Sequence, residues 1–137
     1  MKVALCASMV FTERMLEIKR GLEILGHEVF VSQFAEAYVG KSEPEKEKLT
    51  VHHKKEKDAI RKFWEKIKQS DAVLILNYDR KNIKNYIGGN TLMEIGFAHV
   101  LSKKIYLMNP IPDIEYYESE IKAVNPVIID GDLRKIH

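Results

Sequence analysis

The chain has few of the residues that mark secreted, membrane or fibrous proteins. It contains one cysteine, Cys6, among 137 residues, with 7 glycines and 4 prolines. One cysteine cannot form an intramolecular disulfide, which fits a reducing compartment, and its apolar surroundings predict a buried core residue. No apolar run approaches the roughly 18 to 20 residues of a membrane-spanning helix, and no targeting signal precedes the first predicted strand. We therefore expect a cytoplasmic protein with no membrane partner.

The chain also lacks an excess of charge of either sign. Its 22 basic and 20 acidic residues leave a formal net charge of +2 at pH 7. So small a charge favours neither nucleic acid nor an anionic membrane surface as a partner. It is compatible with the binding of a small anionic ligand. With 45% hydrophobic and 31% charged residues, the chain suits one globular domain over residues 1–137.

Hydrophobic patterning predicts strands that alternate with helices. Apolar strands are predicted at residues 2–7, 27–32, 72–76, 105–108 and 127–129. Helices are predicted at residues 12–25, along a polar stretch whose core packing begins near residue 59, from residue 90 or 91 to about 102, and after residue 113. Right-handed crossovers then give an α/β fold, a three-layer flavodoxin-like or Rossmann-like sandwich with a five-stranded parallel sheet of order 2-1-3-4-5.

In that order the loops after the first and third strands face each other, at the point where open parallel sheets bind ligands. The first loop supplies Ser8, Met9 and Thr12 as candidate substrate contacts. Ser8 and the amides leading to Thr12 are placed to bind a phosphate or a sugar hydroxyl at a helix start. The alternatives are an ordinary turn for Ser8 and an N-cap for Thr12.

The connection after the third strand, residues 77–89, is predicted to carry further site residues. Asp79 is the acid nearest the end of that strand, which makes it and Tyr78 candidates for holding or protonating a base. Polar loop residues at such positions are equally often only solvated. Tyr86 and Asn90 are further candidates, either for contacting the sugar or for orienting the glutamate. Gly88 and Gly89 are candidates for a close approach of the backbone to the ligand, although glycine pairs more often serve turns.

Glu94 follows this glycine-containing loop near the start of a predicted helix. A helix N-terminus favours the ionised carboxylate, so we expect Glu94 to be charged at neutral pH and reachable by solvent at the mouth of the crevice. The alternative is a capping box, because Thr91 and Glu94 have the Thr-x-x-Glu spacing in which the glutamate turns back to the backbone.

Gly-Gly-Asn-Thr, followed by Glu-Ile-Gly-Phe-Ala, two lysines and an apolar strand, resembles the nucleoside 2-deoxyribosyltransferase-like superfamily, which includes deoxynucleotide N-glycoside hydrolases. The resemblance is strongest over residues 71–110. It implies that Glu94 is a nucleophile that forms a covalent glycosyl-enzyme. The chain also departs from the family pattern. Gly88 and Phe63 stand where aspartates are common, Asn90 replaces a glycine, and the first loop lacks its usual glycine.

The resemblance implies cleavage or base exchange at the N-glycosidic bond of a (deoxy)nucleoside or nucleotide. Because the acidic residues are missing, a non-catalytic nucleotide-binding or sensing module on the same fold is the alternative. A homo-oligomeric interaction protein is a third class. We expect no cofactor and no metal. Adjacent His52 and His53 diverge by about 100 degrees on a helix and do not form the two-ligand site of an i, i+4 pair.

The charge-rich stretch of residues 41–58 offers little apolar surface for packing on its own sheet. A lone helix of this length is only marginally stable in water. We therefore expect the stretch to project into solvent or to pack on a partner chain, and expect a homo-oligomer, most simply a dimer. The alternative is a frayed, solvated excursion.

Overall fold

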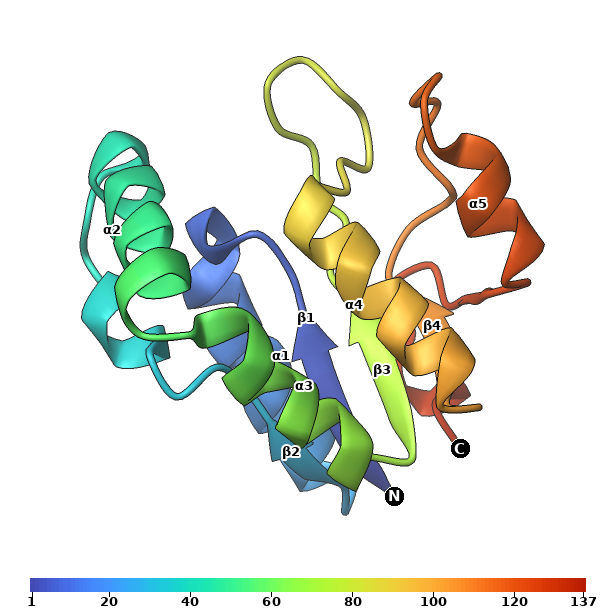
Figure 1. Cartoon of the computed structure of the whole chain (residues 1–137). Coiled ribbons are helices and arrows are strands. Elements are labelled where there is room, and N and C mark those ends of the chain that lie inside the picture. Colours follow the sequence, from blue (N-terminus) through green and yellow to red (C-terminus); the bar gives the residue numbers. More distant parts are fainter.

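The computed structural model describes all 137 residues, Met1–His137. Its core is one sheet of five parallel strands in the order β2-β1-β3-β4-β5, as predicted (Figure 1). No helix is both long and apolar enough to cross a membrane. The elements, in chain order, are β1 (Lys2–Cys6), η1 (Met9–Phe11), α1 (Thr12–Ile24), β2 (Glu28–Phe30), η2 (Ala35–Tyr38), α2 (Glu43–Glu56), α3 (Ala59–Gln69), β3 (Ala72–Ile75), α4 (Gly89–Val100), β4 (Lys104–Leu107), α5 (Glu118–Ala123), β5 (Val127–Ile128) and η3 (Leu133–Lys135).

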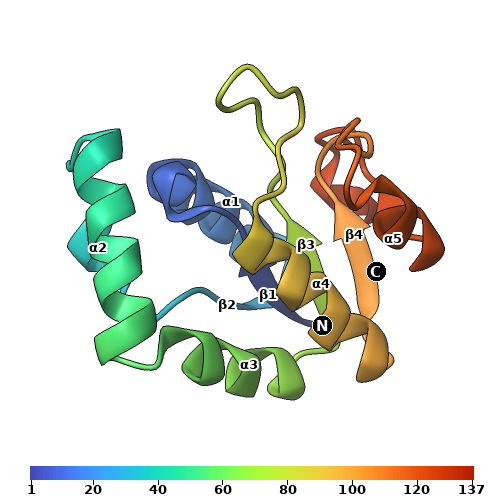
Figure 2. The ribbon, with the colours of Figure 1, turned by 45° about the horizontal axis from the view of Figure 1, so that its top comes forward.

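Successive residues of the central strands face opposite helical layers. Val3 and Leu5 of β1 pack with α1, where Leu22 is fully buried, whereas Ala4 and Cys6 pack with α3 and α4. Figure 2 shows the sheet between these two layers. Burial on both faces explains why the central strands read as continuous apolar runs, and it confirms the predicted three-layer α/β sandwich.

The predicted strands are present with shifted ends. β2 covers only Glu28–Phe30, although residues 27–32 were expected, and β5 has only two residues. Both are edge strands with one neighbour each, so pairing stops as soon as the chain turns away from the sheet. After β2 the chain turns into η2, which packs on η1.

Helix α2 corrects the expectation that residues 41–58 project into solvent or need a partner chain. A capping box starts it: Ser42 Oγ accepts from the Glu45 amide, and the Glu45 carboxylate accepts from the Ser42 amide. One face then packs on η1 and α3 and buries Lys46 and His53 (Figure 1). The docked face is polar, so hydropathy gave no sign of it.

Asn77, directly after β3, ties two strand ends together. Its side-chain amide donates to the carbonyl oxygens of Asn109 and Pro110 at 2.8 and 3.1 Å, and its Oδ1 accepts from the Asn109 amide at 2.9 Å. This tie fixes the point where residues 78–88 leave the sheet. That loop rises at the top of Figure 1, between α2 and α5.

Candidate active site

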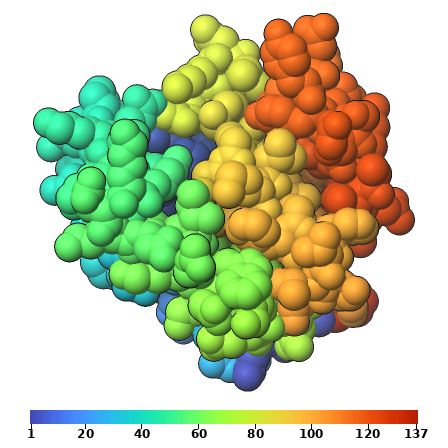
Figure 3. Space-filling view, viewed as in Figure 1, coloured from blue at the N-terminus to red at the C-terminus, as the bar shows by residue number.

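Two adjoining cavities lie at the carboxyl ends of the strands, between α2, the loop of residues 78–88, and α4. The inner chamber, of about 50 Å³, is enclosed by Tyr38, His53 and Glu94 among others. The outer chamber, of about 310 Å³, is lined by Ser8, Arg80 and their neighbours. Figure 3 shows a hollow between α2, the loop and α4, with the N-terminal segment at its floor. The residues shared by both chambers are Ala7, Met9, Thr50, Lys54 and Asn90.

Glu94 lies in the second turn of α4, not in its first. The helix begins at Gly89 with Gly88 as its N-cap, and the Leu92 amide donates to the Gly88 carbonyl oxygen at 2.9 Å. The first turn therefore contains no acidic residue, and the capping box considered for Thr91 does not form.

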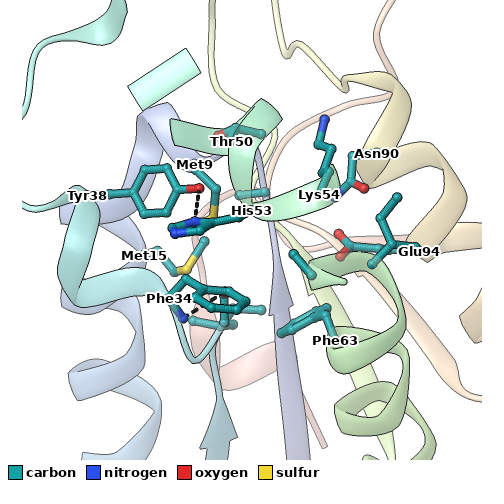
Figure 4. Close-up of a pocket in the computed structure, with 15 residues that line it drawn as sticks. Met9, Met15, Phe34, Tyr38, Thr50, His53, Lys54, Phe63, Asn90 and Glu94 are labelled. Carbon is teal, nitrogen blue, oxygen red and sulfur yellow. Dashed lines mark hydrogen bonds between the residues drawn. The ribbon is translucent and has the colours of Figure 1, made fainter. Parts of the chain in front are cut away.

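The Glu94 side chain is largely buried, with 7% of the residue exposed, so it lies inside the cavity and not at the mouth of the crevice as expected. Burial raises the pKa of its carboxyl from 4.5 to about 8, and the opposing influence of Lys54 is smaller. The expected ionised state at neutral pH is therefore also wrong for the free protein. No hydrogen bond stabilises the carboxyl. Every side-chain oxygen that is fully buried in this structure has a hydrogen-bond partner, so the unpartnered Glu94 oxygens are not fully buried. They face the inner chamber (Figure 4).

The inner chamber has aromatic walls opposite Glu94. His53 stacks on Phe34 with ring centroids 4.3 Å apart, and Tyr38 Oη lies 2.8 Å from His53 Nδ1. Sequence reasoning missed all three residues. The signal that could have found His53 is a helical spacing of mostly polar side chains. The least exposed positions of α2 recur every three or four residues and so share one face of the helix: Lys46, Leu49, Thr50, His53 and Lys54.

The outer chamber is cationic. Three of its lining side chains are basic, Lys54, Arg80 and Lys81, against one acidic, Glu47. The start of α4 lies in the same wall, at Gly89, where free backbone amides and the helix dipole favour an anion. An anionic group is the ligand that fits this chamber.

Arg80 spans the mouth of the outer chamber from the loop to α2. It donates to Glu43 Oε1 at 3.0 Å and to Glu47, and its Nη1 lies 3.4 Å from Ser8 Oγ. Its guanidinium stands over the Tyr86 ring, 5.4 Å from the centroid. The side chain is 10% exposed, so this contact set is a largely buried network.

The structure brings most of the predicted site residues together. Glu94 lines the inner chamber, and Met9 and Asn90 line both. At Gly88 an added Cβ would lie 3.1 Å from Tyr86 Oη, so the loop packs closely there because the residue is glycine. The predicted contacts that line the outer chamber are Ser8, Met9, Tyr86, Gly88, Gly89 and Asn90.

Three predicted residues lie elsewhere. Thr12 is fully buried and its hydroxyl donates to a backbone carbonyl of η1 at 2.5 Å. Tyr78 lies under the Arg14 guanidinium, 4.1 Å from the ring centroid, in a separate surface depression. Asp79 is exposed in the same depression and accepts from the Asn85 amide at 2.9 Å, which closes a turn. Asp79 therefore has no contact with the chamber of Glu94.

Both positions at which aspartates are common in the family that the sequence resembles line the site. Phe63 is in the wall of the inner chamber and Gly88 is in the wall of the outer one. Glu94 is consequently the only carboxyl that lines the inner chamber. No three or more His, Cys, Asp or Glu side chains gather in a cluster that would hold a metal ion.

Comparison with known proteins identifies the fold. No model of a known protein family matches the chain, and no curated protein matches it. The CMP N-glycosidase BcmB of Clostridium botulinum has a similar structure, with a TM-score of 0.54 and 21% identity over 94% of this chain and 87% of that one. A 2-deoxyribosyltransferase of Bacillus psychrosaccharolyticus gives a TM-score of 0.52 and 20% identity over 78% and 71% of the two chains. The chain thus has the nucleoside 2-deoxyribosyltransferase-like fold, and the resemblance seen in the sequence is confirmed at the level of the fold.

Proposed function

We infer that the protein cleaves or exchanges the N-glycosidic bond of a nucleoside 5′-monophosphate, with Glu94 as the nucleophile. The observation that carries this proposal is an unpartnered carboxyl facing a small chamber that continues into a cationic one. Leaving a buried carboxyl without hydrogen bonds costs stability, which a purely structural residue has no reason to bear. The two similar structures are named for this class of chemistry.

In the proposed reaction a Glu94 oxygen attacks the anomeric carbon as the base departs. The glycosyl ester that forms is then resolved by water or by a second base. Attack requires the ionised carboxylate. Lys54, which lines both chambers, is the group that favours this ionised form, and the positive charge developing on the sugar favours it further.

The outer chamber supports a 5′-monophosphate as part of the substrate. Lys54 and Arg80, the Ser8 hydroxyl and the start of α4 supply cationic and hydrogen-bonding groups to a single anionic ligand. We expect CMP to be processed with a kcat/KM at least tenfold above that of cytidine. Arg80→Gln should reduce this ratio, because the variant loses a phosphate contact that the nucleoside never makes.

The test is incubation with ribo- and deoxyribonucleoside 5′-monophosphates and the matching nucleosides, with released base measured by chromatography. Glu94→Gln should abolish release while preserving the rise in melting temperature on adding nucleotide, since the amide keeps the shape and cannot form the ester. Glu120→Gln, at an exposed position of α5, is the matched control and should behave as the wild type. Full activity in Glu94→Gln would eliminate the assignment.

A second candidate is a nucleotide-binding or sensing module without catalysis. One observation favours it: a carboxyl with a pKa of about 8 is mostly protonated at pH 7, and no second carboxyl lines its chamber. A rise in melting temperature with a nucleoside monophosphate, without release of any base over long incubation, would support this reading over the enzyme.

A further inference from the structure

The proposed reaction leaves the departing base without a partner. Breaking the glycosidic bond places negative charge on the base, and a hydrogen-bond donor must stabilise that charge. Asp79 lies outside the chamber and cannot supply the donor. The titratable side chains that line the inner chamber with Glu94 are Tyr38, His53 and Lys54.

His53 is held in one orientation by its surroundings. Phe34 stacks on its ring at an interplanar angle of 22°, and Tyr38 packs edge-on at a centroid distance of 5.4 Å. Tyr38 Oη lies 2.8 Å from Nδ1, and this buried phenol is only 2% exposed. A ring fixed from two sides can present its remaining nitrogen at one defined place.

The Tyr38 contact is compatible with a His53 tautomer that carries its proton on Nε2. Burial raises the pKa of the Tyr38 phenol, so the phenol keeps its proton, and in this tautomer it donates to Nδ1. Burial, together with His52 and Lys57, lowers the pKa of His53, so its ring is neutral at pH 7. In this tautomer the one ring proton resides on Nε2, where it can be donated.

His53 lines the inner chamber, and its Nε2 has no protein partner. No buried side-chain nitrogen in the structure lacks a partner, so Nε2 is not sealed inside the protein. In Figure 4 the His53 ring and the Glu94 carboxyl reach the chamber from opposite sides. At about 50 Å³ the chamber is too small for a whole nucleoside and accepts one edge of a base, with sugar and phosphate outside in the outer chamber.

We propose that His53 binds the leaving base, donating a hydrogen bond from Nε2 to the acceptor beside the glycosidic nitrogen, pyrimidine O2 or purine N3. The role rests on the proposed function. As the bond from Glu94 to the anomeric carbon forms, the carbon–nitrogen bond breaks and its electron pair moves onto the base, where the hydrogen bond stabilises it. Water then hydrolyses the glycosyl ester and supplies the proton that the base takes up.

The test compares two leaving groups. One substrate is CMP, or the nucleotide that wild type cleaves best, and the other is 4-nitrophenyl ribofuranoside 5-phosphate, whose phenolate leaves without such a donor. His53→Leu should lower kcat on the nucleotide about 100-fold and on the nitrophenyl substrate less than fivefold. His53→Gln, which keeps an N–H donor, should recover part of the loss.

The matched control is Lys55→Leu, because Lys55 is exposed on the same helix and lines neither chamber. It should leave both rates unchanged, and far-ultraviolet circular dichroism with melting curves should show all variants folded. Equal losses on both substrates in His53→Leu would mean a structural role and overturn the proposal while leaving Glu94 as the nucleophile. If the wild type cleaves neither substrate, the proposed function and this inference fall together.

Discussion

At Glu94 the stability of the fold and the proposed chemistry make opposite demands on one side chain. The fold buries the carboxyl without a hydrogen bond, which favours the protonated acid. The proposed attack needs the carboxylate. Lys54 is the only group that counters the effect of burial, so the protonation of Glu94 depends on what occupies the space between them.

The raised pKa of Glu94 predicts that stability falls as the pH rises. The folded protein holds this proton up to about pH 8, whereas the unfolded chain releases it near 4.5, so the folded state binds more protons between these values. Glu94→Gln removes the effect. We expect the free energy of unfolding of the variant, relative to that of the wild type, to increase by about 3 kcal/mol between pH 5 and pH 8, measured by urea denaturation. A difference that does not change with pH would contradict the raised pKa.

The same pKa predicts the pH dependence of the reaction. Only the ionised carboxylate attacks, so kcat/KM should rise about tenfold per pH unit through the neutral range and level off above about pH 8. The measurement is initial base release at low substrate concentration from pH 5.5 to 9.5. A rate already level at pH 6 would mean that the free enzyme holds Glu94 ionised.

Among the elements, α2 shows how a charged helix docks without an apolar face. Lys46 is buried, and its Nζ donates to Glu13 Oε2 at 2.5 Å and to the Val10 carbonyl oxygen at 3.4 Å. Lys46 lowers the pKa of the Glu13 carboxyl through this hydrogen bond. With the Tyr38 hydrogen bond to His53, these contacts hold α2 against α1, η1 and η2 and so close one side of both chambers.

We predict that Lys46→Ala loosens α2 without unfolding the sheet. Losing the buried Lys46 stem and its hydrogen bonds should speed amide hydrogen exchange in α2 roughly 5- to 30-fold, which corresponds to about 1–2 kcal/mol of local stability. Exchange in β1 and β3 should not change. Lys48→Ala is the matched control, since Lys48 is exposed on the same helix. Equal exchange rates in the two variants would show that the Lys46 contact does not hold the helix.

At the scale of the whole molecule, association into a homo-dimer stays a prediction. Because α2 packs within its own chain, residues 41–58 no longer require a partner chain, and they give no support for a dimer. The remaining basis is apolar surface on α4, where Met93 is 43% and Val100 is 76% exposed. Light scattering should give a mass that approaches twice the 15.9 kDa of one chain as concentration rises, and Val100→Lys should shift it toward the monomer. A monomer mass at all concentrations would contradict the prediction.

The sequence by itself determined the fold and the choice of Glu94 for the candidate site. Continuous apolar strands such as residues 72–76 can only be central and parallel, and crossover handedness then leaves few strand orders. Glu94 was found because its motif is local: a glycine loop, a helix start and a strand follow one another along the chain. Local patterns of this kind need no knowledge of distant residues.

Tertiary structure alone decided the state of Glu94 and the residues opposite it. The pKa of a carboxyl depends on what covers it, and the cover comes from Phe63 of α3 and Lys54 of α2, far away in the sequence. His53 joins the site because a polar helix docks through hydrogen bonds to Tyr38, and hydropathy does not record such contacts. Asp79 lies only a few residues after β3, yet a turn closed by the Asn85 amide directs it away from the chamber, because the path of a loop is set by its own hydrogen bonds.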